Sequence, residues 1–143
     1  MIRMRYLTIL AITAFIGGCA TPVDPAAIKR HQIQVQEMQT RIFDTNDRRV
    51  LVRSVVAAMQ DLNFIVSNAD AQQGVVTAKK FGPYPIDMTV TIQPVSNRQM
   101  LVHGIAQYKL KTIEDSALYA QFFSSLQTFL PDHLSAGGQA RHD

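Results

Sequence analysis

The sequence contains one cysteine, Cys19, and no tryptophan. A single cysteine cannot form a disulfide within the chain, and it cannot supply a cysteine-based zinc site. Glycine is sparse as well, with seven residues in 143, and none of them builds a glycine-rich phosphate loop. These absences exclude a disulfide-stapled domain and weigh against a nucleotide-binding one.

Catalytic and metal-binding patterns are also missing. No histidine has a second ligand at metal spacing; the four are His31, His103, His133 and His142. Ser124 and Ser125 lack a nucleophile-elbow setting. Asp44 and Asp47 could be paired carboxylates, but helix capping explains them better. We therefore expect no enzyme activity, no metal and no cofactor. The alternative, an enzyme with an unrecognised site, would require a deep polar pocket.

The first residues have the layout of a secretory signal. Arg3 and Arg5 provide a positive region, and residues 6–16 form an apolar region. A membrane-spanning helix needs about 18 to 20 apolar residues, whereas this run ends before Thr21. We therefore expect residues 1–18 to be a cleaved signal peptide.

The segment that ends at Cys19 resembles the lipobox read by lipoprotein signal peptidase. It consists of the branched Ile16 and the small Gly17 and Gly18 before the cysteine. The resemblance implies cleavage before Cys19 and acylation of its thiol and amine, for which palmitate is a suitable label. Two or more acyl chains anchor a protein stably. Ala20, in place of an aspartate, favours the periplasmic face of the outer membrane.

Removing the signal changes the charge balance. The whole chain has a net charge of +3, but Arg3 and Arg5 leave with the signal. The mature chain then has 12 basic against 11 acidic residues, a net charge of +1. No basic run interleaved with aromatics remains, so we expect no nucleic-acid partner.

Composition and periodicity divide the chain into four expected parts: the signal peptide over 1–18, a lipidated N-terminus and tether over 19–36, an α+β periplasmic domain over 37–134 and a disordered tail over 135–143. Within the tether, Ile28, Ile33 and Val35 could belong to a short helix or a strand, and periodicity does not decide between them.

The expected domain has the order β-α-β-β-β-β-α. Strands are expected over 38–43, 64–67, 75–80, 86–92 and 100–110, with helices over about 48–62 and 116–130. On the first strand, Met38, Thr40 and Ile42 share a face. Because the helices are striped and the strands alternate, we predict a two-layer sandwich, a largely antiparallel sheet with both helices on one face.

Several side chains have specific expected roles. Asp47 should cap the first helix, and Asp115 or Ser116 the second. Gly104 and Ala106 should leave space for a helix to lie against the sheet. The last strand should direct alternate residues into the core: Met100, Val102, Gly104, Ala106, Tyr108 and Leu110.

Two aromatic pairs are candidates for a protein contact. Phe81 and Tyr84 lie in a proline-containing loop that could present them to a partner, although folding back over the sheet edge is the more ordinary outcome. Phe122 and Phe123 are adjacent, so one of them could be exposed, although core packing is again the more ordinary outcome.

Five segments resemble the landmarks of a family of small proteobacterial lipoproteins with no assigned activity. They are residues 38–41, Met-Gln-Thr-Arg; 43–45, Phe-Asp-Thr; 60–64, Gln-Asp-Leu-Asn-Phe; 74–80, Gly-Val-Val-Thr-Ala-Lys-Lys; and 119–126. The resemblance covers residues 36–133. The rhythm of an apolar helix, Leu-Asn-Phe, a strand and Gly-Val-Val is also similar to domains of the lipoprotein accessory subunit of the outer-membrane β-barrel assembly machine. That second likeness concerns the fold alone.

These observations favour a membrane-anchored lipoprotein whose domain is a non-catalytic binding or scaffolding module. Its expected partners are the membrane, reached through Cys19, and an envelope protein. The alternative is a structural subunit of an envelope-spanning secretion or conjugation apparatus, because such machines recruit small lipoproteins.

Overall fold

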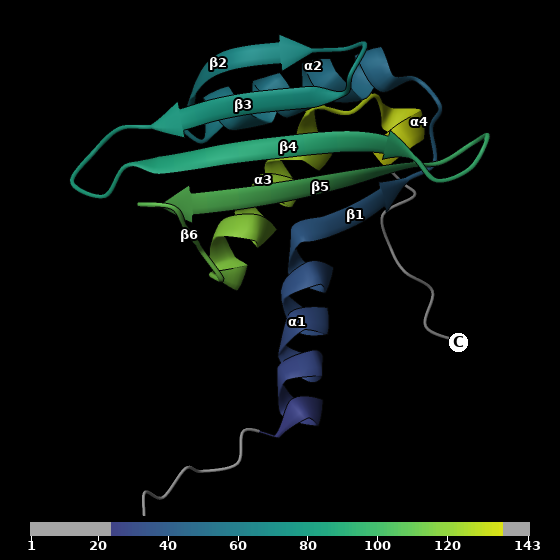
Figure 1. Cartoon of the computed structure of the whole chain (residues 1–143). Helices are drawn as coiled ribbons and strands as arrows, with labels where there is room; N and C mark the ends of the chain where they lie inside the picture. The colour runs from purple at the N-terminus through teal and green to yellow at the C-terminus, as the bar shows by residue number, and fades with distance from the viewer. Residues whose placement is uncertain (1–23, 136–143) are drawn as a thin grey trace, which may run out of the picture.

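A computed structural model describes residues 24–135 of the chain (Figure 1). The expected signal peptide, Cys19 with Ile16, Gly17 and Gly18, and residues 136–143 of the expected tail lie outside these residues. The elements are α1 Pro25–Gln39, β1 Thr40–Phe43, α2 Arg48–Asp61, β2 Ile65–Asp70, β3 Val75–Lys80, β4 Ile86–Pro94, β5 Met100–Tyr108, β6 Lys111–Thr112, α3 Ser116–Phe129 and α4 Asp132–Ser135. No helix within 24–135 is long and apolar enough to cross a membrane.

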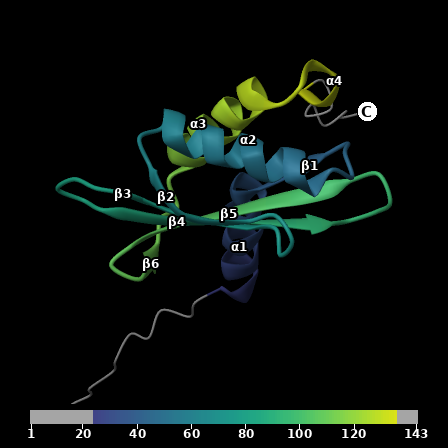
Figure 2. The same cartoon turned by 90° about the horizontal axis from the view of Figure 1, so that it is seen from above.

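The strands form one antiparallel sheet in the order β1-β5-β4-β3-β2, and β6 pairs with β5 beside β1. Helices α2 and α3 cover one face of this sheet, and no helix layer among residues 24–135 covers the other face (Figure 2). The prediction of an α+β sandwich with two helices on one side is therefore confirmed.

Strict alternation along the central strands builds the core. Met88, Val90 and Ile92 of β4 are buried, while the residues between them face outward. On β5, Gly104 leaves the expected space: a Cβ built there would lie 3.7 Å from Cε1 of Phe122, which packs over it from α3. The small residue thus lets the aromatic ring of the helix approach the sheet.

Both main helices begin at expected aspartates, Asp47 and Asp115, whereas Asp44 caps neither helix and accepts a hydrogen bond from Nε2 of Gln99. The Asp47 carboxylate accepts a hydrogen bond from the backbone N–H of Val50, and the Asp115 carboxylate accepts one from Ala117. Each cap pairs a backbone N–H that has no partner within the helix. The two caps therefore set the starting points of α2 and α3.

The adjacent phenylalanines of α3 are both buried, as core packing predicted. Phe122 is 0% and Phe123 is 3% exposed, and their rings meet edge to face at 5.0 Å between centroids. The alternative, with one of them exposed, is wrong. The guanidinium of Arg41 lies 5.0 Å from the Phe123 ring centroid, so β1 helps to cover the second ring.

The N-terminal part differs from expectation, because residues 25–39 form a 15-residue helix. Asp24 caps it and Pro25 occupies its first turn, a favourable arrangement for a helix start. This helix, α1, crosses the boundary expected after Gln36, and the strand expected from Met38 begins at Thr40. On that strand Ile42 faces outward, and Phe43 enters the core.

The last long strand is shorter than expected. It ends at Tyr108, and a two-residue turn at Lys109 and Leu110 reverses the chain into β6. Leu110 is 93% exposed, so its expected core position is wrong. The reason is that both turn residues take positive φ, +48° and +65°, which breaks the alternation of the strand.

Candidate functional site

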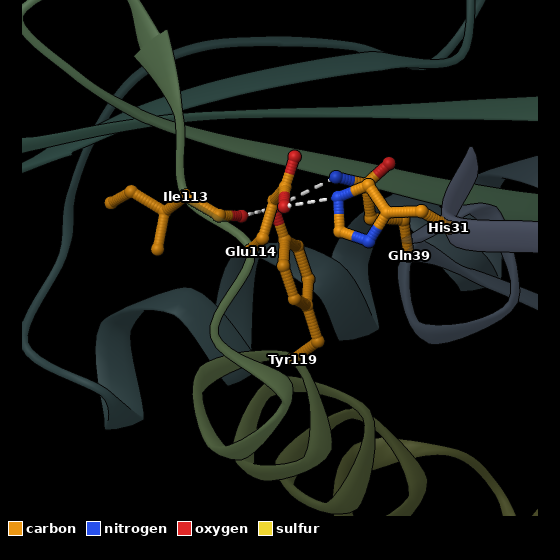
Figure 3. Close-up of polar contacts among 5 residues, drawn as sticks. All are labelled: His31, Gln39, Ile113, Glu114 and Tyr119. Atoms are coloured by element: carbon orange, nitrogen blue, oxygen red, sulfur yellow. Dashed lines mark hydrogen bonds and ion pairs between the residues drawn. The ribbon is translucent and has the colours of Figure 1, made fainter. Parts of the chain in front are cut away.

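The first candidate feature is the junction between α1 and the sheet, organised by Tyr119 of α3 (Figure 3). Its hydroxyl accepts hydrogen bonds from Nε2 of Gln39, at 3.1 Å, and from the backbone N–H of Ala106, also at 3.1 Å. It donates one of 2.8 Å to the carbonyl oxygen of Ile113. One side chain thus joins the end of α1, strand β5 and the segment that leads into α3.

The side chains of this network are buried, so the loss of one of its hydrogen bonds would lower the stability of the domain. Tyr119 is 0% exposed and Gln39 is 5% exposed. A buried polar group that loses its partner costs about 1 to 3 kcal/mol. If the end of α1 moved away from the sheet, the hydrogen bond between Gln39 and Tyr119 would break. The cost of breaking it therefore favours the observed position of α1.

Two exposed contacts extend the junction. Nε2 of His31, in the middle of α1, lies 2.8 Å from a carboxylate oxygen of Glu114, which follows β6 (Figure 3). Nη1 of Arg41 donates hydrogen bonds of 2.9 Å to the carbonyls of Glu37 and Thr40. A cation at the C-terminal end of a helix also complements the helix dipole. Together these contacts fix the direction in which α1 leaves the domain.

The second candidate feature is the aromatic loop, residues 81–85, between β3 and β4. Phe81 is 67% and Tyr84 is 74% exposed, so the expectation that they fold back over the sheet is wrong. Their exposure leaves both available for a partner. The Tyr84 ring instead meets Tyr108 of β5 edge to face, with 5.9 Å between centroids. The aromatic loop and the β5–β6 turn therefore lie side by side at one end of the sheet.

The uncovered sheet face carries a mixed surface beside Phe81. Nζ of Lys79 forms an ion pair of 3.1 Å with Asp87 on the neighbouring strand. Ile65, paired with Lys79 in register, is 62% exposed. With Thr89, these residues line a shallow hollow of about 380 Å³. Its combination of exposed apolar groups and one ion pair suits contact with another surface better than enclosure of a small molecule.

His103 also lies on this face. Its Nδ1 is 3.1 Å from Oγ1 of Thr40, and the two residues are paired in register across β1 and β5. Partial burial lowers the pKa of His103 below its ordinary value of 6.5. No other histidine or acid lies across from it in the sheet, where its neighbours are Thr40 and Thr91. The interpretation of His103 as a sheet-surface histidine is consistent with these contacts.

A small cavity of about 190 Å³ opens at the same end of the sheet as the aromatic loop. Phe64, Met88 and Leu118 are among the apolar residues that line it, and Lys80 and Asp115 add two charges. Nζ of Lys80 lies 5.6 Å from the Phe64 ring centroid. Ligand pockets usually enclose about 300 to 1,000 Å³, so this cavity could hold a side chain of a partner but not a typical substrate.

Within residues 24–135 there is no group of three or more His, Cys, Asp or Glu side chains that could hold a metal ion. The candidate residues of the chain thus fall into three places. Cys19 lies outside the described part, Phe81 and Tyr84 lie on the exposed loop, and the junction around Tyr119 was not predicted at all. The sequence does contain one signal from which the helix held by this junction could have been predicted, the Asp24-Pro25 pair, which is a typical helix start.

A search against models of known protein families finds no match to this chain, and a search of curated proteins finds no significant one.

Proposed function

We propose that this chain is a membrane-anchored bacterial lipoprotein whose domain is a non-catalytic binding or scaffolding module on the periplasmic face of the outer membrane. The acyl anchor would be carried by Cys19, following recognition of Ile16, Gly17 and Gly18 by the signal peptidase. The partner would be an envelope protein, reached in part through Phe81 and Tyr84.

The observation that carries the proposal is the continuous link from the region of the anchor to the domain. Helix α1 begins at Pro25, shortly after Cys19 in sequence, and continues directly into β1. Gln39 and Tyr119 hold its end, while His31 and Glu114 hold its middle. An anchor on Cys19 would therefore restrain both the distance of the domain from the membrane and its orientation.

A held orientation is useful for binding, because anchoring confines the search for a partner to a membrane surface and raises the effective concentration. The exposed aromatic loop and the uncovered sheet face beside it are the surfaces that such a restraint would present. The shallow hollow that Phe81 helps to line suits a contact with another protein surface.

The anchor is tested by fractionating cells that make the wild-type chain or the Cys19→Ala variant in the presence of labelled palmitate. We expect label only in the wild-type chain, which should sediment with outer membranes. Wild-type protein without label, found together with the variant in the soluble periplasm, would contradict the proposal.

The binding role is tested by a photo-crosslinking amino acid placed at Phe81, with Val95 as the matched control. Val95 is 53% exposed and lies in the turn between β4 and β5, at the opposite end of those strands. We expect one envelope protein to be captured from position 81 and not from position 95. If the captured protein migrates in a large complex after mild detergent extraction, the alternative of an apparatus subunit would be favoured. Equal capture from both positions would count against a specific contact at the loop.

A further inference from the structure

The turn between β5 and β6 carries exposed side chains that do not contribute to the core of the domain. Leu110 projects at its apex and is 93% exposed, with Lys109 and Lys111 on either side. Tyr108 and Tyr84 form a ring pair at its base. An apolar residue between two cations, above two tyrosines, matches the composition of protein segments that lie at a lipid–water interface.

The charges at this turn are free to meet an anionic surface. No carboxylate within residues 24–135 forms an ion pair with Lys109 or Lys111. Two acids near the turn are engaged elsewhere, since Asp87 pairs with Lys79 and Glu114 pairs with His31. Nζ of Lys109 lies 5.2 Å from the Tyr108 ring centroid, so that cation already sits over the aromatic base.

The position of the turn is compatible with the proposed anchor. The contact between Glu114 and His31 places the segment after β6 beside the middle of α1, and β6 lies along the same sheet edge as β1 (Figure 1). From His31 to the start of α1 is about 9 Å. Residues 20–24 could span at most about 17 Å, and the four Cα–Cα steps from Leu110 to Glu114 about 13 Å. One membrane surface is therefore within reach of both Cys19 and Leu110.

We propose that the β5–β6 turn is a second membrane contact, in which Leu110 enters the interface of an anionic phospholipid surface while Lys109 and Lys111 bind its headgroups. Tyr108, at the base of the turn, lies at the headgroup level, and Tyr84 beside it borders the surface proposed for the protein partner. The inference rests on the proposed acyl anchor, which alone would leave the domain free to tilt. With the second contact, the domain would have one defined orientation relative to the lipid.

The test uses the acylated mature protein in vesicles of phosphatidylglycerol and phosphatidylcholine that contain brominated lipid. Because the chain has no tryptophan, Leu110→Trp introduces a single reporter, and Val95→Trp is the control at the far end of the sheet. We expect bromolipid to quench the indole at position 110 at least about twofold more strongly than the indole at position 95. The difference should shrink in vesicles of phosphatidylcholine alone and at high salt.

A charge-reversal variant distinguishes the contribution of the two lysines to membrane contact from that of the acyl anchor. Lys109→Glu with Lys111→Glu, added to Leu110→Trp, should reduce the quenching at position 110 to that at position 95, while flotation with the vesicles is retained through the acyl chains. If Leu110→Trp disturbs folding, as judged by circular dichroism, Tyr84→Trp replaces it as the reporter on the neighbouring loop.

The outcomes are distinct. Protein that floats with the reporter at position 110 no more quenched than the one at position 95 would overturn the turn contact and leave the anchor intact. Protein that does not float would overturn both. If the reporter at position 110 became shielded only in native envelope membranes and not in pure lipid, the turn would bind a protein, and the lipid proposal would be wrong.

Discussion

Nε2 of Gln39 donates a 3.1 Å hydrogen bond to the phenolic oxygen of Tyr119, 80 positions further along the chain. The same oxygen accepts a bond from the backbone of β5 and donates one to the carbonyl of Ile113. A single hydroxyl thereby couples the helix that would lead to the anchor with the sheet and with α3. The coupling makes the orientation of α1 a property of the folded domain.

Removal of this hydroxyl should destabilise the domain substantially. In Tyr119→Phe, the amide of Gln39, the N–H of Ala106 and the carbonyl of Ile113 lose a buried partner together. We expect the free energy of unfolding, measured in urea, to fall by about 3 kcal/mol. Tyr108→Phe, at a partly exposed ring, is the control and should change stability by less than about 0.5 kcal/mol. Equal effects of the two substitutions would show that the network contributes little.

His103 should make stability depend on pH in the weakly acidic range. Burial lowers its pKa below 6.5 in the folded state. Between that lowered value and 6.5 the unfolded chain binds more protons, so the free energy of unfolding decreases as the pH falls through this window. In His103→Gln the decrease should be smaller, as measured by urea unfolding across the window. An unchanged pH profile in the variant would assign the dependence to other groups.

Gly74 should tolerate no side chain. It has a φ of +71°, and an added Cβ would collide with the carbonyl oxygen of Ile92, whose own N–H donates to the Gly74 carbonyl at 2.7 Å. We expect Gly74→Ala to lower the free energy of unfolding by more than about 2 kcal/mol, because strain and collision add. Gly104→Ala is the comparison. Its Cβ would meet the flexible end of Met88 at 3.2 Å, and the cost should be smaller.

Leu110 should be unfavourable for folding although it serves the proposed membrane contact. Its φ of +65° is one that glycine adopts without strain, and at 93% exposure it gains little from packing. Leu110→Gly should therefore raise the free energy of unfolding by about 1 kcal/mol. The same variant, labelled with Tyr84→Trp, should lose bromolipid quenching in anionic vesicles. A decrease in stability would show instead that Leu110 packs on the domain.

Local patterns in the sequence determined much of the fold. The alternation of β4 and the aspartates before α2 and α3 are short-range signals, because a pleat and a helix cap depend on neighbours within a few residues. The α+β sandwich followed from them. Cys19, the signal peptide and the membrane anchor rest on the sequence alone and stay predictions.

The tertiary structure decided what depends on distant partners. Phe123 packs in the core with Arg41 over its ring, and the buried amide of Gln39 finds its hydrogen-bond partner in Tyr119; neither partner is near in sequence. Tyr84 is exposed, and its ring meets Tyr108 at one end of the sheet instead of folding inward. Leu110 is exposed because two residues other than glycine adopt positive φ, which side-chain periodicity cannot reveal. The sequence by itself determined the layers of the fold and predicts the anchor, and long-range packing decided how α1 is held against the domain.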